Sequence, residues 1–290
     1  MEDILTALAS RLKQKDNSAN KGTNGTLTVA AGSELYRGAA ALASSAALRC
    51  GVGIVRLVSV EKVISSAAAR LPECVFLPTE SENGAMSYRD FARKMPAFSK
   101  SRAVLAGCGM TDCTDTGNII AELIKYGGYQ LIIDADGLNS IKNRPELLKS
   151  AALPPVITPH IGEMARLTGA STDAIKSDRE KTAAEFSRKY NCITVLKDCK
   201  TVISSPEGKL FVCDRPNAGL AKGGSGDVLS GIISSFAAQG YDAFDAAVCG
   251  TALHSLAAES AREKLTEYSM LPSDIVAEIP GVFARIGKTR

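Results

Sequence analysis

Short apolar runs alternate with helical patterns along most of the chain. The helical patterns repeat apolar residues every three or four positions, whereas the runs between them are short and rich in β-branched residues. This order predicts βαβ units that build a mostly parallel sheet with helices on both faces. The predicted strands are 27–31, 53–58, 103–106, 131–134, 155–158 and 193–196, and the helices between them include 38–49, 118–126 and 178–190.

One region departs from this alternation. Residues 201–204 and 209–213 flank the turn signal Pro206-Glu-Gly, which predicts an antiparallel hairpin at one edge of the sheet. The pattern predicts an N-terminal helix and loop over 1–20 and, in the last third, helices at 228–239, 242–261 and from 273 onward. We find no internal repeat and no linker, so the sequence predicts a single α/β domain over residues 1–290.

Composition narrows the class of protein. The 290 residues are 45% hydrophobic and 22% charged, which is typical of a folded globular chain. The net charge is only +3 and the basic residues are dispersed, which argues against a nucleic-acid partner. The eight cysteines include no CxxC pair and are interpreted as reduced thiols. The first residues lack the pattern of a signal peptide and no later run is long enough to cross a bilayer, so we expect a cytoplasmic protein without a membrane partner.

The strongest chemical signal is the glycine-rich segment 217–227, which leads directly into the apolar-periodic helix 228–239. Glycines before a helix let backbone N–H groups converge on an anion, and the helix dipole adds to the attraction, so a phosphate fits here. Asp227 would repel that phosphate. It is better suited to be the base that takes a proton from a hydroxyl reacting with the phosphoryl group. The alternative is an Asp N-cap behind a flexible loop.

Several further candidates follow predicted strands directly, at the end where ligands gather in parallel sheets. They are Asp134 with Asp136, the segment Gly107-Cys-Gly, and the segment Lys197-Asp-Cys-Lys-Thr. The two acids suit either magnesium binding or turn geometry. Because these strand ends share one rim with the start of the glycine-rich helix, their convergence favours a single functional site.

Two histidines complete the candidates. His160 and Glu163 lie in Thr158-Pro-His-Ile-Gly-Glu, immediately after a predicted strand. The sequence leaves His160 open between a substrate contact and a turn-stabilising contact, and Glu163 open between a helix cap and a residue that holds a metal-bound water. His254 lies inside a helical pattern and is interpreted as a packed core histidine.

The motifs form an ordered set from Lys21 to Asp227. They are Lys21-Gly-Thr-Asn-Gly, Tyr36-Arg-Gly-Ala-Ala, Ala47-Leu-Arg-Cys-Gly-Val-Gly, Asp134-Ala-Asp-Gly-Leu-Asn, Thr158-Pro-His-Ile-Gly-Glu, Val195-Leu-Lys, Lys200-Thr-Val-Ile and 217–227. This set resembles the ADP- or ATP-dependent NAD(P)H-hydrate dehydratases, a branch of the ribokinase-like superfamily. The resemblance implies a ribokinase-like three-layer α/β/α sandwich. The chain departs from the family pattern at Cys108 and Ile161, where proline is usual, and at Gly137, where alanine is common.

The resemblance also implies a reaction and a set of roles. The S-epimer of hydrated NADH or NADPH receives phosphate from ADP or ATP on its hydroxyl, phosphate leaves, and the reduced ring is restored, with Mg²⁺ offsetting phosphate charge. Asp227 is then the base, and a homo-oligomer such as a tetramer is expected. By position, the hydrate-binding residues are Ala39, Gly109, His160 and Asp227, and the nucleotide-binding residues are Lys197, Asp198, Cys199, Lys200, Thr201, Gly224, Ser225 and Gly226; Glu163 is the metal candidate, through water.

Two alternatives stay open at this point. A small-molecule kinase of the same superfamily, acting on a thiazole or pyrimidine alcohol, would share the fold and the base but leave phosphate on its product. A non-catalytic nucleotide sensor would need the phosphate-binding loop but no base, so Asp227 argues against it. The sequence does not decide between ADP and ATP.

Overall fold

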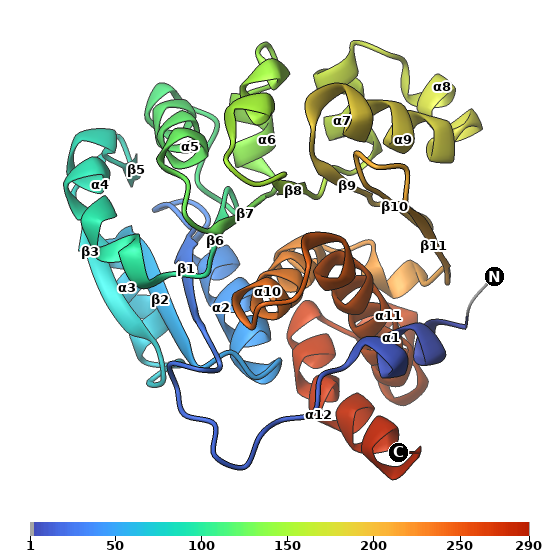
Figure 1. Cartoon of the computed structure of the whole chain (residues 1–290). Coiled ribbons are helices and arrows are strands. Elements are labelled where there is room, and N and C mark those ends of the chain that lie inside the picture. The colour runs from blue at the N-terminus through green and yellow to red at the C-terminus, as the bar shows by residue number, and fades with distance from the viewer. Residues whose placement is uncertain (1–2, 290) are drawn as a thin grey trace.

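A nine-stranded sheet forms the centre of the protein in this computed structural model, which describes residues 3–289 (Figure 1). The order across the sheet is β11-β10-β9-β8-β7-β6-β1-β2-β3. Seven neighbouring strands from β3 to β9 pair in parallel, and β10 and β11 add the antiparallel edge. The bounds are β1 Thr26–Ala30, β2 Ile54–Val60, β3 Val75–Thr79, β6 Ala103–Ala106, β7 Gln130–Ile133, β8 Val156–Ile157, β9 Ile193–Leu196, β10 Lys200–Ser204 and β11 Leu210–Asp214.

The sequence prediction misses the other edge of the sheet. Strand β3 carries Pro78 and is mostly exposed or half-buried, so it lacks the continuous apolar run of the inner strands. Proline lacks a backbone donor and is tolerated on edge strands, which is where β3 lies. A small separate hairpin follows it, formed by β4 (Ser81–Glu82) and β5 (Ala85–Met86).

Helices cover both faces of the sheet (Figure 1). One layer includes α5 (Thr114–Tyr126), α6 (Asp136–Ser140), α7 (Ile161–Thr168), α8 (Thr172–Ser177) and α9 (Arg179–Tyr190). The opposite layer includes α1 (Ile4–Arg11), α2 (Arg37–Arg49), α10 (Ser225–Ala238), α11 (Ala243–Ser269) and α12 (Pro272–Thr289). Helices α3 (Glu61–Ala68) and α4 (Tyr88–Lys94) lie beside the β3 edge, and short 3₁₀ turns occur at Met95–Lys100, Pro145–Ser150 and Ala218–Leu220. The three-layer architecture is therefore confirmed.

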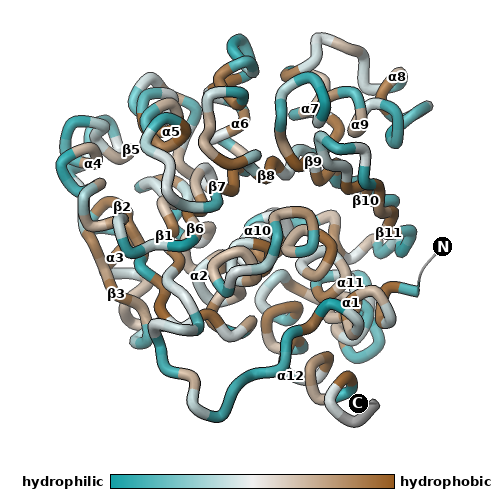
Figure 2. The backbone as a smooth tube through the Cα atoms, viewed as in Figure 1, coloured by the Kyte–Doolittle hydropathy of each residue, from teal (hydrophilic) through white to brown (hydrophobic). Residues whose placement is uncertain are grey.

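The apolar pattern explains the burial. All five residues of β1 and all four of β6 are buried, as expected for strands covered on both faces. The alanine-rich helix α2 packs within the chain against α10, and the Ser235 hydroxyl donates to the Ala47 carbonyl oxygen at 2.9 Å. Figure 2 shows the inner strands as hydrophobic segments between more polar loops.

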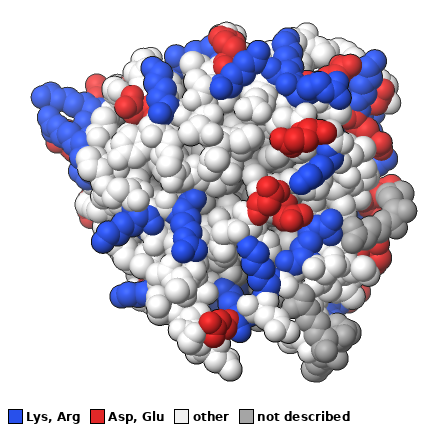
Figure 3. All heavy atoms as spheres, in the orientation of Figure 1, with Lys and Arg blue, Asp and Glu red and all other residues white. Residues whose placement is uncertain are grey.

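The surface is mixed in charge. On the face drawn in Figure 3, basic and acidic side chains are interspersed and surround a largely uncharged centre. No helix within the described residues has both the length and the apolar character that a bilayer span requires.

Candidate active site

The carboxyl ends of four neighbouring parallel strands bring the predicted polar residues together. Cys108 follows β6, Asp134 follows β7, His160 follows β8 and Lys197 follows β9. An isolated parallel bridge joins His160 to Lys197, so the pairing continues past the ends of β8 and β9. The predicted convergence at one rim is thus present.

A buried ion pair lies at the centre of this rim. The Lys197 ammonium donates to Asp134 Oδ1 at 2.7 Å, and their side chains are 18% and 1% exposed. The Ser230 hydroxyl, on α10, donates to the second oxygen of Asp134 and lies 3.4 Å from the Thr158 hydroxyl. Burial alone would raise the pKa of Asp134, but the charge and hydrogen bonds of its partners outweigh it and lower that pKa.

The same pairing keeps Lys197 charged. Burial alone would lower the pKa of Lys197, but the charges of Asp134 and Glu163 raise it above its usual value. A Cβ atom placed on Gly226 would lie only 3.2 Å from the Lys197 ammonium, so the cation stands directly beside the first turn of α10. A side chain at position 226 would crowd the ammonium, whereas glycine leaves the space between cation and helix open.

The first turn of α10 has the geometry of an anion site. Its N-cap, Gly224, has a φ of +104°, a left-handed conformation that glycine adopts readily, and no described side chain caps the helix. The first N–H groups of a helix lack partners within it and carry partial positive charge. The Lys222 ammonium turns away from this mouth and donates to the carbonyl oxygens of Tyr268 and Met270. The cation that serves the mouth is therefore Lys197.

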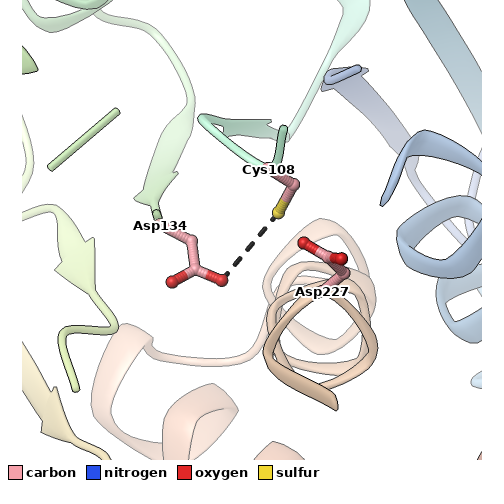
Figure 4. Close-up of side chains that lie close together, drawn as sticks. All are labelled: Cys108, Asp134 and Asp227. Carbon is pink, nitrogen blue, oxygen red and sulfur yellow. Dashed lines mark hydrogen bonds between the residues drawn. The ribbon is translucent and has the colours of Figure 1, made fainter. Parts of the chain in front are cut away.

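Asp227 lies in the same turn and faces the strand ends. Oxygen and sulfur atoms of Asp227, Asp134 and Cys108 all lie within 4.8 Å of one another (Figure 4). Burial and then the charge of Asp134 raise the pKa of Asp227 to about 6, while Cys108 and Lys197 act in the opposite direction. A carboxylate with this pKa is mostly ionised at neutral pH yet is a stronger base than an ordinary Asp.

Two predicted hydrate-binding residues, Gly109 and Ala39, are neighbours in space. Gly109 has a φ of +62°, and a Cβ atom there would lie 2.9 Å from the Ala39 Cβ and 2.7 Å from the Tyr36 Cβ. The start of α2 therefore packs directly on the loop that follows β6. With Asp227 nearby, these residues outline one side of the rim.

His160 and Glu163 form a helix cap. The His160 Nδ1 accepts hydrogen bonds from the N–H groups of Gly162, at 2.9 Å, and Glu163, and the Glu163 carboxylate accepts from the His160 N–H at 2.9 Å. The His160 side chain is nonetheless 53% exposed, whereas that of Glu163 is 5% exposed. Burial raises the pKa of Glu163 to about 7. The capping roles are thus present, and the hydrate and metal roles stay predictions.

A cavity of about 840 Å³ opens between the segment after β9, the glycine-rich loop and α11. Seven of the eight predicted nucleotide-binding residues line it, namely Lys197, Asp198, Cys199, Thr201, Gly224, Ser225 and Gly226. The eighth, Lys200, forms an ion pair with Glu180 at 2.9 Å. Asp198 is held by the Arg179 guanidinium at 2.9 Å.

Three residues of this site were not predicted in their observed roles. Asp134 was a magnesium or turn candidate, and the structure shows it as the partner of Lys197. Ser230 lies in the apolar pattern of α10 and gave no chemical signal. His254 is buried, as predicted, but it also lines the cavity.

Comparison with known proteins identifies the family. The model of a family described as NAD(P)H-hydrate dehydratase matches residues 27–281. The chain belongs to the NAD(P)H-hydrate dehydratase family. The predicted resemblance is therefore confirmed.

Relatives in this family differ in length. The chain is 30% identical to the ADP-dependent (S)-NAD(P)H-hydrate dehydratase of Xanthomonas campestris, covering 98% of this chain and 97% of that one. It is 32% identical to the bifunctional NAD(P)H-hydrate repair enzyme Nnr of Moorella thermoacetica, but spans only 54% of it. The chain thus spans about half the length of the bifunctional relatives and nearly all of the stand-alone one.

Solved structures agree with the fold. The ADP/ATP-dependent NAD(P)H-hydrate dehydratase of Bacillus subtilis, co-crystallised with ATP and Mg²⁺, superposes with a TM-score of 0.84 at 26% identity and 98% coverage of this chain and 97% of that one. A ribokinase-like superfamily protein of Enterococcus faecalis gives a TM-score of 0.83 at 23% identity, covering 97% and 94% of the two chains. The predicted ribokinase-like fold is confirmed.

Proposed function

We propose that this member of the NAD(P)H-hydrate dehydratase family restores NADH and NADPH from their hydrated S-epimers, using ADP or ATP. The observation that carries the proposal is the placement of Asp227, whose pKa is raised to about 6, at the mouth of α10 beside the buried cation of Lys197. This arrangement supplies a base and a phosphate site within one helical turn. The name of the full-length Xanthomonas relative supports the same reaction.

The first step is phosphoryl transfer. The hydrate hydroxyl attacks the terminal phosphoryl group, Asp227 accepts the hydroxyl proton, and the bond from phosphorus to the leaving nucleotide breaks. AMP leaves when ADP is the donor, and ADP leaves when ATP is the donor. The N–H groups at the start of α10 and the Lys197 ammonium stabilise the charge that develops on the phosphoryl oxygens.

The second step is elimination. The bond between ring carbon and phosphate oxygen breaks, and inorganic phosphate leaves with the electron pair. The adjacent ring carbon loses a proton to water, and the electrons of that C–H bond form the ring double bond. Phosphate is a far better leaving group than hydroxide, which is what the consumed nucleotide provides. By position, we assign Ala39, Gly109 and His160 to the hydrate. The seven predicted nucleotide-binding residues that line the cavity, in the segments 197–201 and 224–226, are assigned to the nucleotide.

Mg²⁺ belongs to the proposal as a companion of the nucleotide phosphates. When bound, it neutralises phosphate charge, and it characteristically keeps several waters and takes few protein ligands. Both Glu163 oxygens face His160, one accepting its backbone N–H at 2.9 Å and the other lying 3.4 Å from Nε2. This arrangement fits contact through a water rather than direct coordination. A cytoplasmic location and a homo-oligomeric state stay predictions.

The test is a repair assay. The purified protein is incubated with hydrated NADH, Mg²⁺ and either ADP or ATP, and recovery of reduced-nicotinamide absorbance is followed. Recovery that requires nucleotide supports the proposal, and the two rates identify the preferred donor. A protein that binds nucleotide but restores no NADH would contradict it and direct a screen of small alcohols for kinase activity.

A further inference from the structure

The loop after β6, residues 107–111, has an unusual backbone. Its first, third and fifth residues, Gly107, Gly109 and Thr111, have φ angles of +122°, +62° and +74°. Glycine adopts such conformations readily, whereas a β-branched residue such as threonine is strained by them. Strain of this kind persists only where the surrounding structure imposes it. The contacts that impose it on Thr111 therefore shape the loop that carries Gly109, which we assign to the hydrate.

The first of these contacts comes from Asp136. The Thr111 N–H donates to Asp136 Oδ2 at 2.8 Å, the length of a strong hydrogen bond to a carboxylate. Burial raises the pKa of Asp136, and the bond from the Thr111 N–H opposes that rise because it stabilises the ionised carboxylate. Asp136 is the first residue of α6, so the helix fixes its backbone. Its carboxylate is therefore placed to hold the Thr111 amide.

The second contact comes from Ser33. The Thr111 hydroxyl donates to the Ser33 hydroxyl at 3.1 Å. Ser33 is buried, and its oxygen also accepts from the N–H of Tyr36, the N-cap of α2, at 3.3 Å. The start of α2 packs on Gly109 and carries Ala39, the other hydrate candidate of this region. Thr111 thus joins Asp136 on one side to the hydrate-binding segments on the other.

The two acids that follow β7 face opposite sides of that strand. Asp134 pairs with Lys197, which follows β9, whereas Asp136 accepts from Thr111, which follows the loop after β6. The sheet order places β9 and β6 on opposite sides of β7. One strand end therefore organises the nucleotide side of the site through Asp134 and reaches the hydrate side through Asp136.

We propose that Asp136 is a positioning residue for the hydrate, which holds Thr111 in its strained conformation and so fixes Gly109 against the start of α2. The inference rests on the proposed function, because it takes Gly109 as a hydrate contact. Asp136 acts through Thr111 rather than by touching a substrate. Its removal should therefore weaken use of the hydrate and leave nucleotide binding unchanged.

The test combines a loss of the contact with a relief of the strain. In Asp136→Ala the Thr111 backbone relaxes, so KM for hydrated NADH should rise about tenfold, the factor that one hydrogen bond to a charged group contributes. Adding Thr111→Gly to that variant should bring KM back towards the wild-type value, because glycine keeps a positive φ without strain. Calorimetry should give the same affinity for ADP in wild type and both variants.

The control removes a neighbouring charge that does not hold Thr111. Asp112 is the next residue of the chain, and its carboxylate pairs with Lys142 at 2.6 Å on the surface. Asp112→Ala should keep the wild-type KM for the hydrate. Assays at pH 8 keep Asp227 ionised in every variant, since its pKa is about 6, so the lost charge of Asp136 does not change the base.

Amide hydrogen exchange gives a second readout that needs no substrate. Exchange over residues 107–110 should be faster in Asp136→Ala and slower again when Thr111→Gly is added. If Asp136→Ala does not fold, Asp136→Asn replaces it, because the amide oxygen is a weaker acceptor for the same N–H. Its smaller rise in KM should again be relieved by Thr111→Gly.

The outcomes separate this inference from the proposed function. A wild type that restores NADH, with a KM unchanged by loss of Asp136, overturns the positioning role alone. A rise in KM that Thr111→Gly does not relieve, or an equal loss of ADP affinity, overturns it too, because Asp136 would then act by charge or by general stability. A wild type that binds ADP but restores no NADH contradicts the proposed function, and the positioning role falls with it.

Discussion

Two buried polar regions flank the start of α10. The polar atoms of one are paired, and those of the other lack hydrogen-bond partners. Asp134, Lys197 and Ser230 satisfy one another through an ion pair and hydrogen bonds. The Ser225 hydroxyl on α10 and the Thr251 hydroxyl and His254 Nε2 on α11 have no partner among the described residues. The paired region holds the Lys197 ammonium beside the first turn of α10. In the unpaired region each buried polar atom lacks a hydrogen bond, which costs about 1–3 kcal/mol per atom.

Removing the base should have the largest effect. Asp227→Asn keeps the size of the side chain but cannot accept the hydroxyl proton, so kcat should fall about 10²–10⁴-fold. Nucleotide affinity should change little, because the cation and the helix N–H groups remain. Repair is followed by absorbance and nucleotide binding by calorimetry. Unchanged turnover would remove Asp227 from the mechanism.

Breaking the paired region should mainly damage stability. Asp134→Asn leaves the buried ammonium of Lys197 without its counter-charge, which typically costs about 3–5 kcal/mol of unfolding free energy. Glu180→Gln is the control, because its pair with Lys200 is much more exposed and should contribute about 0–1 kcal/mol. Denaturant unfolding measures both. Equal, small losses in the two variants would show that the buried pair is not a structural requirement.

The raised pKa of Asp227 predicts a pH dependence of activity. Protonation below a pKa of about 6 removes the base, so kcat/KM should fall about tenfold for each pH unit below that value. The folded-state pKa lies above the usual 3.8, so the carboxyl favours folding at low pH. That contribution is lost as pH rises from about 3.8 through 6. Asp227→Asn should abolish this loss in pH-dependent unfolding, whereas an acid limb near pH 4 in wild type would contradict the raised pKa.

The smallest predicted effects are changes in the free energy of unfolding, and they differ in sign between the two regions. Ser230→Ala removes a donor to buried Asp134 and should destabilise the protein by about 1–2 kcal/mol. Thr251→Val removes an unpartnered hydroxyl at nearly constant volume and should leave the nucleotide-free protein equally or more stable, by up to about 1 kcal/mol. Thermal unfolding without nucleotide compares them. Destabilisation of both to the same extent would mean that the Thr251 hydroxyl has a partner after all.

The spacing of apolar residues and the turn sequences were sufficient to predict most of the fold. The inner strands are continuous apolar runs because both of their faces are covered, and the hairpin of β10 and β11 carries a recognisable turn. Strand β3 was not predicted, because this exposed edge strand with a proline has neither a continuous apolar run nor a recognisable turn. The predicted helix ended at residue 261, before the last turns of α11, because residues 262–269 are mostly polar and exposed.

The site was predictable only as far as adjacency follows from topology. The carboxyl ends of parallel strands share one rim of the sheet. The proximity of Asp134, His160 and Lys197 could therefore be predicted from the sequence. Which of them pair is a matter of side-chain reach, so the contact of Lys197 with Asp134 had no signal in the sequence. His254 looked like a core residue because burial and cavity lining leave the same helical pattern.

The most direct test of the central claim is the stoichiometry of repair. Hydrated NADH, Mg²⁺ and the preferred nucleotide are incubated with the protein, and restored NADH and free phosphate are measured in the same samples. The proposed mechanism predicts one phosphate released for each NADH restored, and neither product when Asp227→Asn replaces wild type. Nucleotide consumed with phosphate retained on an organic product, and no NADH restored, would contradict the dehydratase mechanism and identify the chain as a kinase.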